Sequence, residues 1–237
     1  MNAIQMGLEV PLDRIYIQGE NSMDSDELRT LSINFLICCY FGQSENLGKA
    51  AIDRAYVDMA AHTIDIPDLD TRWESRYKAS CVISTRLKGY SQENRFDKWH
   101  KDTITELKQV YEGNLTEGQA QKWLNMTIKY LFVFSTLLGI RDYRLSEFKF
   151  FLKSTDASKY KIPIDGFVLK GSGIESIKNK SWSKLDKDYG DVEEKLVANH
   201  NFFWELENWE VFAKNEKKKP DKGTYARYIK DKDYGSY

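Results

Sequence analysis

The sequence predicts an all-α protein that folds as one compact domain, with at most a minor β element near its N-terminus. Three observations favour this class. Apolar residues recur at helical spacing in successive segments, capping residues precede these segments, and only 4 prolines occur in 237 residues. Because 41% of the residues are hydrophobic, the chain can bury a core without disulfides or metal ions.

Three helices are predicted in the first part of the chain, at residues 24–41, 44–62 and 68–87. Each follows a side chain that can accept hydrogen bonds from the first turn. These capping candidates are Ser22 or Asp24, then Ser44, then Asp68 or Asp70. Gly89 ends the third helix. Ahead of them, residues 14–18 alternate between polar and apolar side chains, as an edge strand does.

A fourth helix is predicted from Ser91 to Tyr111, and a fifth over residues 116–138. The fifth has the clearest signals, because Thr116 and Gln119 have the spacing of a capping box and Gly139 follows the last turn. It is apolar on most of its circumference, which predicts a central position.

Shorter helices complete the predicted domain. The first covers residues 145–152. Pro163 imposes an extended approach to Asp165, which caps a helix reaching Lys170. Two more helices follow, at residues 192–200 and 202–213. The single domain therefore spans residues 1–213, and the lysine-rich segment 214–237 is predicted to be a flexible basic tail.

The net charge of −1 hides an uneven distribution. Residues 1–75 contain 13 acidic and 5 basic residues, whereas the rest of the chain contains 23 acidic and 30 basic residues. An acidic front and a basic back favour a polyanion-binding face built from the later segments, although chance variation of surface charge explains the asymmetry equally well.

The three cysteines and the hydropathy indicate a cytoplasmic protein without a membrane span. Cys38, Cys39 and Cys81 form no Cys-x-x-Cys motif, so reduced, buried thiols are expected. The N-terminus lacks the pattern of a signal peptide. The longest apolar run, residues 131–140, is about half as long as a bilayer requires. The isolated histidines predict no metal site.

Lys122 and Asp165 are the candidate catalytic residues. Lys122 and Lys129 are seven residues apart and share a face of the predicted central helix. A lysine on a central helix either extends to solvent or is held in a cleft, where its amine can act as a nucleophile. Asp165 has two interpretations, as an ordinary helix cap and as a catalytic carboxylate.

The pattern Gly118-x-x-x-Lys122 on a helix, followed by Ile-Pro-Ile-Asp165, resembles the helix-hairpin-helix DNA glycosylase superfamily. The archaeal 8-oxoguanine glycosylase branch is most similar, since Gln121-Lys122 and Lys129 repeat its spacing. The resemblance covers residues 113–170, with Gly113-Asn-Leu-Thr-Glu-Gly118 in place of the usual Leu-Pro-Gly-Val-Gly hairpin. The interval of 43 residues from Lys122 to Asp165 requires an insertion around residues 139–158.

The resemblance implies a glycosylase-like core at about residues 90–213 that binds double-stranded DNA and flips out a damaged or modified base. Asp165 would stabilise the cationic sugar, and Lys122 would either attack C1′ or pair with Asp165, so lyase activity stays open. The hairpin N–H groups would hold a phosphate. Repair and defence against modified foreign DNA are both open. A monomer without a cofactor is expected. The substrate-binding and DNA-binding candidates are Gly118, Gln119, Gln121, Trp123, Asn125 and Lys129, with Trp123 better suited to the core than to a pocket wall.

Two alternatives use other residues. Arg95 and His100 have the Arg-x4-His spacing that resembles helical ribonucleases of the HEPN class, although a surface pair at this spacing is common by chance. The aromatic segment 201–209 suits a partner surface of a non-enzymatic interaction protein, or a closing helix packed on the core.

Overall fold

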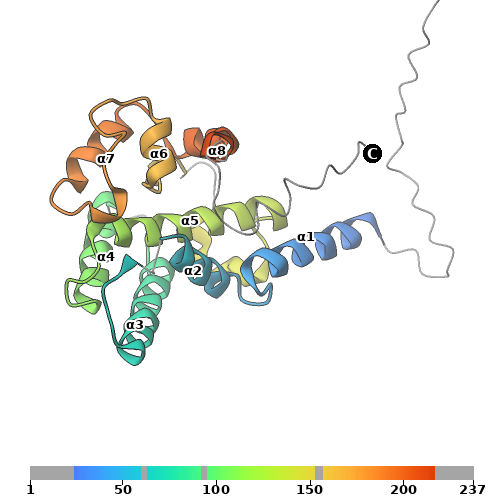
Figure 1. The fold of residues 1–237 in the computed structure, drawn as a ribbon. Coiled ribbons are helices and arrows are strands. Elements are labelled where there is room, and N and C mark those ends of the chain that lie inside the picture. The colour runs from blue at the N-terminus through green and yellow to red at the C-terminus, as the bar shows by residue number, and fades with distance from the viewer. Residues whose placement is uncertain (1–23, 60–62, 92–94, 153–156, 217–237) are drawn as a thin grey trace, which may run out of the picture.

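Helix α5 (Glu117–Leu138) organises the structure, a computed structural model that describes residues 24–59, 63–91, 95–152 and 157–216. The helix begins with the predicted capping box. Thr116 Oγ1 accepts the Gln119 N–H, and Gln119 Oε1 accepts the Thr116 N–H. Gly139 ends it with a φ of 89°. Most of its residues are buried, because other elements cover it from two sides (Figure 1).

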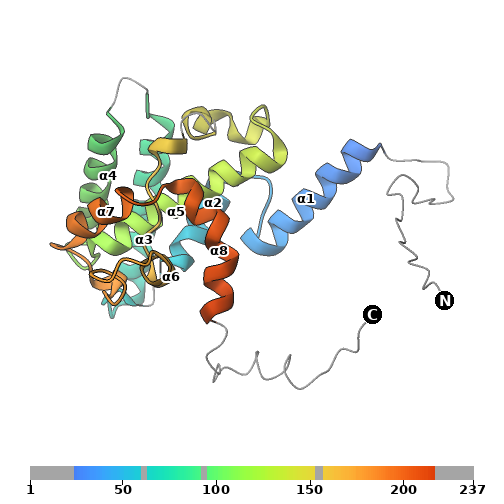
Figure 2. The same ribbon diagram turned by 90° about the horizontal axis from the view of Figure 1, so that it is seen from above.

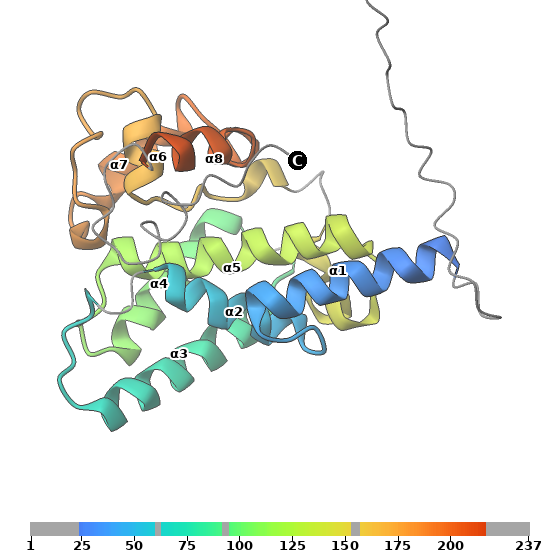
Figure 3. The ribbon, with the colours of Figure 1, turned by 45° about the vertical axis from the view of Figure 1, so that its right-hand side comes forward.

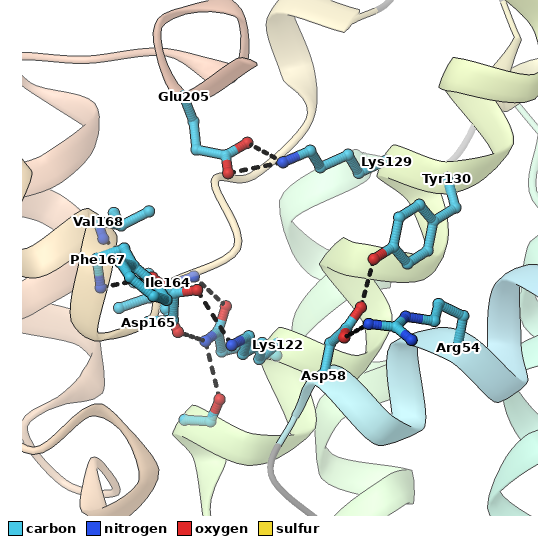
Figure 4. Close-up of polar contacts among 12 residues, drawn as sticks. Arg54, Asp58, Lys122, Lys129, Tyr130, Ile164, Asp165, Phe167, Val168 and Glu205 are labelled. Atoms are coloured by element: carbon cyan, nitrogen blue, oxygen red, sulfur yellow. Dashed lines mark hydrogen bonds and ion pairs between the residues drawn. The ribbon is translucent and has the colours of Figure 1, made fainter. Parts of the chain in front are cut away.

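The larger hydrophobic core lies on one side of α5. The helices that build it with α5 are α1 (Ser25–Phe41), α2 (Leu47–Asp58), α3 (Leu69–Lys88), α4 (Phe96–Val110) and the 3₁₀ helix η2 (Tyr143–Phe151). The Trp123 indole donates to the Ile52 carbonyl at 3.0 Å, which fixes α5 on α2. Asp58 pairs with Arg54 at 2.9 Å and accepts a hydrogen bond from Tyr130 (Figure 4).

A second layer covers the opposite side of α5. Residues between Ile162 and Leu196 form a second apolar core within it, whereas Phe202 of its last helix joins the larger core. The layer comprises α6 (Gly166–Gly171), the 3₁₀ helix η4 (Trp182–Lys184), α7 (Tyr189–Val197) and α8 (Phe202–Glu216), and the short 3₁₀ helix η3 (Ala157–Lys159) leads into it. Figure 2 shows this layer lying over α5 while α1 projects away from the bundle. Figure 3 shows α5 between the second layer and helices α2 and α3.

The predicted all-α class is confirmed, since the described ranges contain helices and no strand. Several boundaries differ. Asn46 rather than Ser44 caps α2, with its Oδ1 accepting the Lys49 N–H. The segment predicted as a helix at 145–152 is 3₁₀, and the non-helical angles of Phe148 at its centre divide it by a kink. Helix α7 begins three residues before the predicted start, and α8 extends to Glu216 into the predicted tail. The predicted strand at 14–18 and residues 217–237 lie outside the described ranges.

The expectation of buried cysteines is wrong. Cys38, Cys39 and Cys81 are all exposed. For the first two the reason is that α1 packs through a narrow face on which only Ile37 is fully buried. None of the helices in the described ranges combines the length and the apolar character that crossing a membrane requires.

Gly118 provides a direct test of how the second layer sits on α5. Its N–H donates to the Leu185 carbonyl at 2.8 Å, and a Cβ at this position would lie 2.1 Å from the Trp182 carbonyl oxygen. We expect Gly118→Ala to lower the free energy of unfolding by at least about 1–3 kcal/mol, because backbone atoms of η4 must move. Urea unfolding followed by circular dichroism measures the change.

Gly190→Ala is the matched control, because an added Cβ on this α7 residue would meet no atom within 4 Å. It should raise the stability slightly, by less than about 1 kcal/mol, since alanine favours a helix more than glycine does. Equal urea midpoints for Gly118→Ala and Gly190→Ala would contradict the close contact between α5 and η4.

Candidate active site

A row of buried polar side chains runs along the face of α5 that meets the second layer. Gln121, Lys122, Asn125 and Lys129 are all less than one-tenth exposed. The row lies between apolar residues of α5 and of the second layer, so each of these side chains needs a polar partner across the junction. The partners come from residues 162–165, from η4 and from α8.

The structure brings Lys122 and Asp165 together. Lys122 Nζ lies 3.1 Å from Asp165 Oδ2, and the two side chains are 10% and 4% exposed (Figure 4). The other carboxylate oxygen, Oδ1, accepts the N–H groups of Phe167 and Val168 at 2.9 Å each. Asp165 is therefore both the cap of α6 and the counter-charge of a buried ammonium group.

An indole covers the Lys122 ammonium. Lys122 Nζ lies 4.4 Å from the centre of the Trp182 ring, within the range of a cation–π contact. Trp182 belongs to η4 and is partly exposed. The lysine thus has a carboxylate on one side and an aromatic face on another, and the indole borders solvent.

Gln121 holds the backbone just before Asp165. Its Oε1 accepts the Ile164 N–H at 3.2 Å, and its Nε2 donates to the Ile164 carbonyl at 2.9 Å. Asn125, one turn along α5, donates to Gln121 Oε1 and to the Ile162 carbonyl. The two amides therefore grip the extended segment that leads into α6, and this segment fixes the position of the carboxylate.

Lys129 repeats the arrangement two turns along the helix. Its Nζ lies 2.7 Å from both carboxylate oxygens of Glu205 and 4.8 Å from the centre of the Trp209 ring. Burial raises the pKa of the Glu205 carboxyl above its ordinary value, although the Lys129 ammonium opposes this shift. Trp209 is 38% exposed, so an indole borders solvent here as well.

Other predicted site residues have partners inside the chain. Trp123 has no exposed surface and lies in the larger core, so it is a packing residue and no pocket wall. The Gln119 side chain completes the capping box and donates to Thr63 Oγ1 at 2.8 Å. Gly118 is buried against η4. These three contacts with the chain replace the predicted contacts with DNA.

The predicted phosphate site at the start of α5 is also occupied from within. The turn between α4 and α5 has the form of a hairpin, with positive φ at Glu112 and Gly113. However, the Glu117 N–H donates to Asp186 Oδ1 at 3.3 Å, and the next N–H donates to the Leu185 carbonyl. A carboxylate of the chain thus lies where a phosphate was expected, so that expectation is wrong for these N–H groups.

The residues of the ribonuclease alternative do not meet at the surface. Arg95 is exposed at the start of α4, whereas His100 is 3% exposed. His100 Nε2 lies 2.7 Å from Asn125 Oδ1, and burial lowers the pKa of the imidazole. His100 is therefore an internal partner of the polar row on α5.

Sequence reasoning missed Trp182, Glu205 and Trp209. The spacing of Glu205 and Trp209, four residues apart in an aromatic segment, was a usable signal for one face of a helix. Trp182 follows a loop, where no periodicity marks a contact. Within the described ranges, no three His, Cys, Asp or Glu side chains gather closely enough to hold a metal ion.

Comparisons of the chain with protein-family models, curated proteins and solved structures found no match. A function for the candidate site is therefore inferred from the geometry of the site itself.

The two hydrogen bonds between Gln121 and the backbone of Ile164 can be tested by measuring the free energy of unfolding. In Gln121→Met the side chain keeps its length but can no longer satisfy the buried N–H and C=O of Ile164. We expect the free energy of unfolding to fall by about 2 kcal/mol or more, because each unsatisfied buried group costs about 1–3 kcal/mol. Gln109→Met on the exposed face of α4 should change it by less than about 0.5 kcal/mol. Equal stabilities of Gln121→Met and Gln109→Met in urea titrations would show that Gln121 does not hold Ile164 in place.

Proposed function

We propose that the protein is a DNA glycosylase that excises a damaged or chemically modified base. The observation that carries the proposal is the buried pair of Lys122 and Asp165, 3.1 Å apart, at the junction of two apolar cores. An amine and a carboxylate in a site with little solvent are the groups that cleavage of a sugar–base bond uses. The resemblance of the flanking sequence to helix-hairpin-helix glycosylases agrees with this assignment.

Asp165 acts electrostatically in the proposed reaction. Two backbone N–H groups fix its carboxylate, which therefore needs no reorganisation when positive charge develops on the sugar. Lys122, once deprotonated, forms a bond from its amine nitrogen to C1′ while the bond from C1′ to the base breaks. The base leaves with the electron pair of that bond and takes up a proton. The bound nitrogen then loses a proton, and its lone pair opens the sugar ring by breaking the bond from C1′ to O4′, which takes up a proton. The imine formed in this way permits strand cleavage by elimination.

The flipped nucleotide would reach the pair from the edge where the two indoles border solvent. Lys122 and Lys129 are separated by about 10 Å along the helix, at a rise of about 1.5 Å per residue. Trp182 accompanies the first lysine and Trp209 the second. Aromatic faces of this kind stack on extruded bases. The proposed base site thus extends along α5 from one lysine to the other.

In this proposal, the segment that carries Trp182 contacts the phosphate backbone of the DNA. Residues 170–187 contain five lysines and two acidic residues, a net charge of +3 beside the candidate site. Lysine side chains neutralise phosphates without reading sequence. They replace the hairpin N–H groups, which the chain itself occupies. The chemistry suits both repair and defence against foreign DNA with modified bases.

Asp165→Asn separates the catalytic role of this residue from its role as a cap. Asparagine also caps helices, so α6 should persist while the negative charge disappears. We expect base release from duplex DNA with a single 8-oxoguanine to slow by about 100-fold or more. Heat-labile abasic sites and the free base are measured. Duplexes with uracil or an alkylated purine serve as further substrates if 8-oxoguanine is not released.

Asp68→Asn is the matched control, because Asp68 caps α3 in the same way, by accepting the Thr71 N–H, and is exposed. It should leave base release unchanged. The assignment of Asp165 is wrong if Asp165→Asn and Asp68→Asn release the base at the wild-type rate.

Trapping with borohydride identifies the nucleophile. If the Lys122 amine attacks C1′, reduction of the imine should leave a covalent adduct between protein and DNA. Lys122→Arg keeps the positive charge beside Asp165 but forms no imine, so the adduct should be lost. Lys129→Arg should retain it, because Lys129 pairs with Glu205 instead. Denaturing electrophoresis measures the adduct. An adduct that persists in Lys122→Arg would contradict the assignment, and base release without any adduct would leave Lys122 a positioning role.

A further inference from the structure

A hollow lies on the other side of α5 from the Lys122–Asp165 pair. It is a groove of about 430 Å³ between α2, α3 and η2, and α2 and α3 lie opposite to the second layer in Figure 1. Its volume falls within the range of about 300–1,000 Å³ that small-molecule sites have. Ile52 and Phe148 are among the apolar residues that line it.

Two exposed aromatic rings line the groove from α3. Trp73 is 59% exposed and Tyr77 is 71% exposed. They are four residues apart, so they lie on the same face of the helix. Large aromatic rings exposed beside an apolar hollow indicate a binding surface, because a ligand that covered them would remove a large apolar area from water.

The same face of α3 continues with groups that suit an anion. Ser80 and Ser84 supply hydroxyl groups, and Lys88 lies at the end of the helix. The Arg76 guanidinium lies 5.0 Å from the centre of the Trp73 ring and pairs with Asp53 at 3.0 Å. Arg76 thus braces Trp73 from one side while the rest of the indole stays exposed.

The two lysines of the groove are held weakly. Lys88 Nζ lies 2.8 Å from Glu147 Oε2, with side chains 40% and 62% exposed. Lys49, 61% exposed, pairs with Asp53, which is shared with Arg76. Exposed ion pairs of this kind contribute about 0–1 kcal/mol, so an incoming phosphate can replace the carboxylates at little cost.

We propose that this groove binds one nucleotide unit, with its base against Trp73 and Tyr77 and its phosphate at Lys49, which shares Asp53 with Arg76. A flat ring and an anion within one ligand match the stacking faces, the cations and the volume of the groove together. A folded protein partner would need about 800 Å² of contact on this chain, more than a hollow of this size offers. The site is independent of the proposed glycosylase activity. Both a free nucleotide and a nucleotide within a single strand have this chemistry.

Calorimetric titration of the 237-residue chain with adenosine monophosphate and with an eight-nucleotide oligothymidylate, at low salt, tests the proposal and separates the two sources. Trp73→Ala should weaken binding about 5- to 150-fold, because stacking of one base on an aromatic side chain contributes about 1–3 kcal/mol. Lys49→Gln should weaken binding and reduce its salt dependence. Asp165→Asn should leave the affinity unchanged, which distinguishes the groove from the candidate active site.

Two substitutions on α3 serve as controls. Leu69→Ala removes an exposed apolar side chain and Lys78→Gln an exposed lysine, and neither residue is among those that line the groove. Both should bind the nucleotides as the wild type does. The proposal is overturned if neither nucleotide binds, if Trp73→Ala binds as tightly as Leu69→Ala, or if an acidic peptide that contains tryptophan binds while both nucleotides do not.

Discussion

An ammonium group is costly to bury without a counter-charge, and helix α5 buries two of them. Lys122 and Lys129 lie on the face that the second layer covers, so that layer must supply a carboxylate to each. Asp165 and Glu205 do so from α6 and α8. Removing one partner of such a pair costs about 3–5 kcal/mol, because the other charge is left buried and unpaired. The placement of α6 and α8 therefore depends on the two lysines.

The cost of burying charged groups also argues that the two ion pairs on α5 have a functional role. Well-packed apolar residues in place of a buried ion pair often leave stability unchanged or increase it. The second layer already has an apolar core of its own, so two ion pairs are an expensive way to attach it to α5. An amine beside a fixed carboxylate is, however, what the proposed reaction requires. The free energy lost when the charged groups are desolvated is then the cost of holding reactive groups in a buried site.

Local signals predicted much of the fold. The capping box at Thr116 and the glycine after Leu138 gave both ends of α5, and Asp68 and Gly89 gave both ends of α3. These signals act within one turn of the chain, so they can be read without the tertiary structure. The apolar circumference of residues 117–138 likewise predicted a central helix, and the structure confirms this position.

The remaining features depend on contacts between distant segments. Glu205 is 76 residues from Lys129, and no local pattern specifies that the two must pair. Asp186 lies at the start of α5, where the sequence alone suggested an open phosphate site. Trp182 covers Lys122 only because Gly118 allows the backbone of η4 to approach so closely. Tertiary packing decides each of these contacts, which is why sequence reasoning placed Lys122 and Asp165 in one site but missed Trp182, Glu205 and Trp209.

The proposed reaction makes two opposing demands on this site. Low exposure of Lys122 and Asp165 strengthens their electrostatic action, yet a flipped nucleotide must reach them. Gln121 and Asn125 hold residues 162–164 on α5, so the carboxylate cannot give way without loss of buried hydrogen bonds. Trp182, by contrast, is partly exposed and contacts the lysine through its ring face. A base that replaced this indole over the ammonium would preserve the cation–π contact. Entry past Trp182 therefore costs less than entry past Asp165, and η4 is the element from which substrate access is expected.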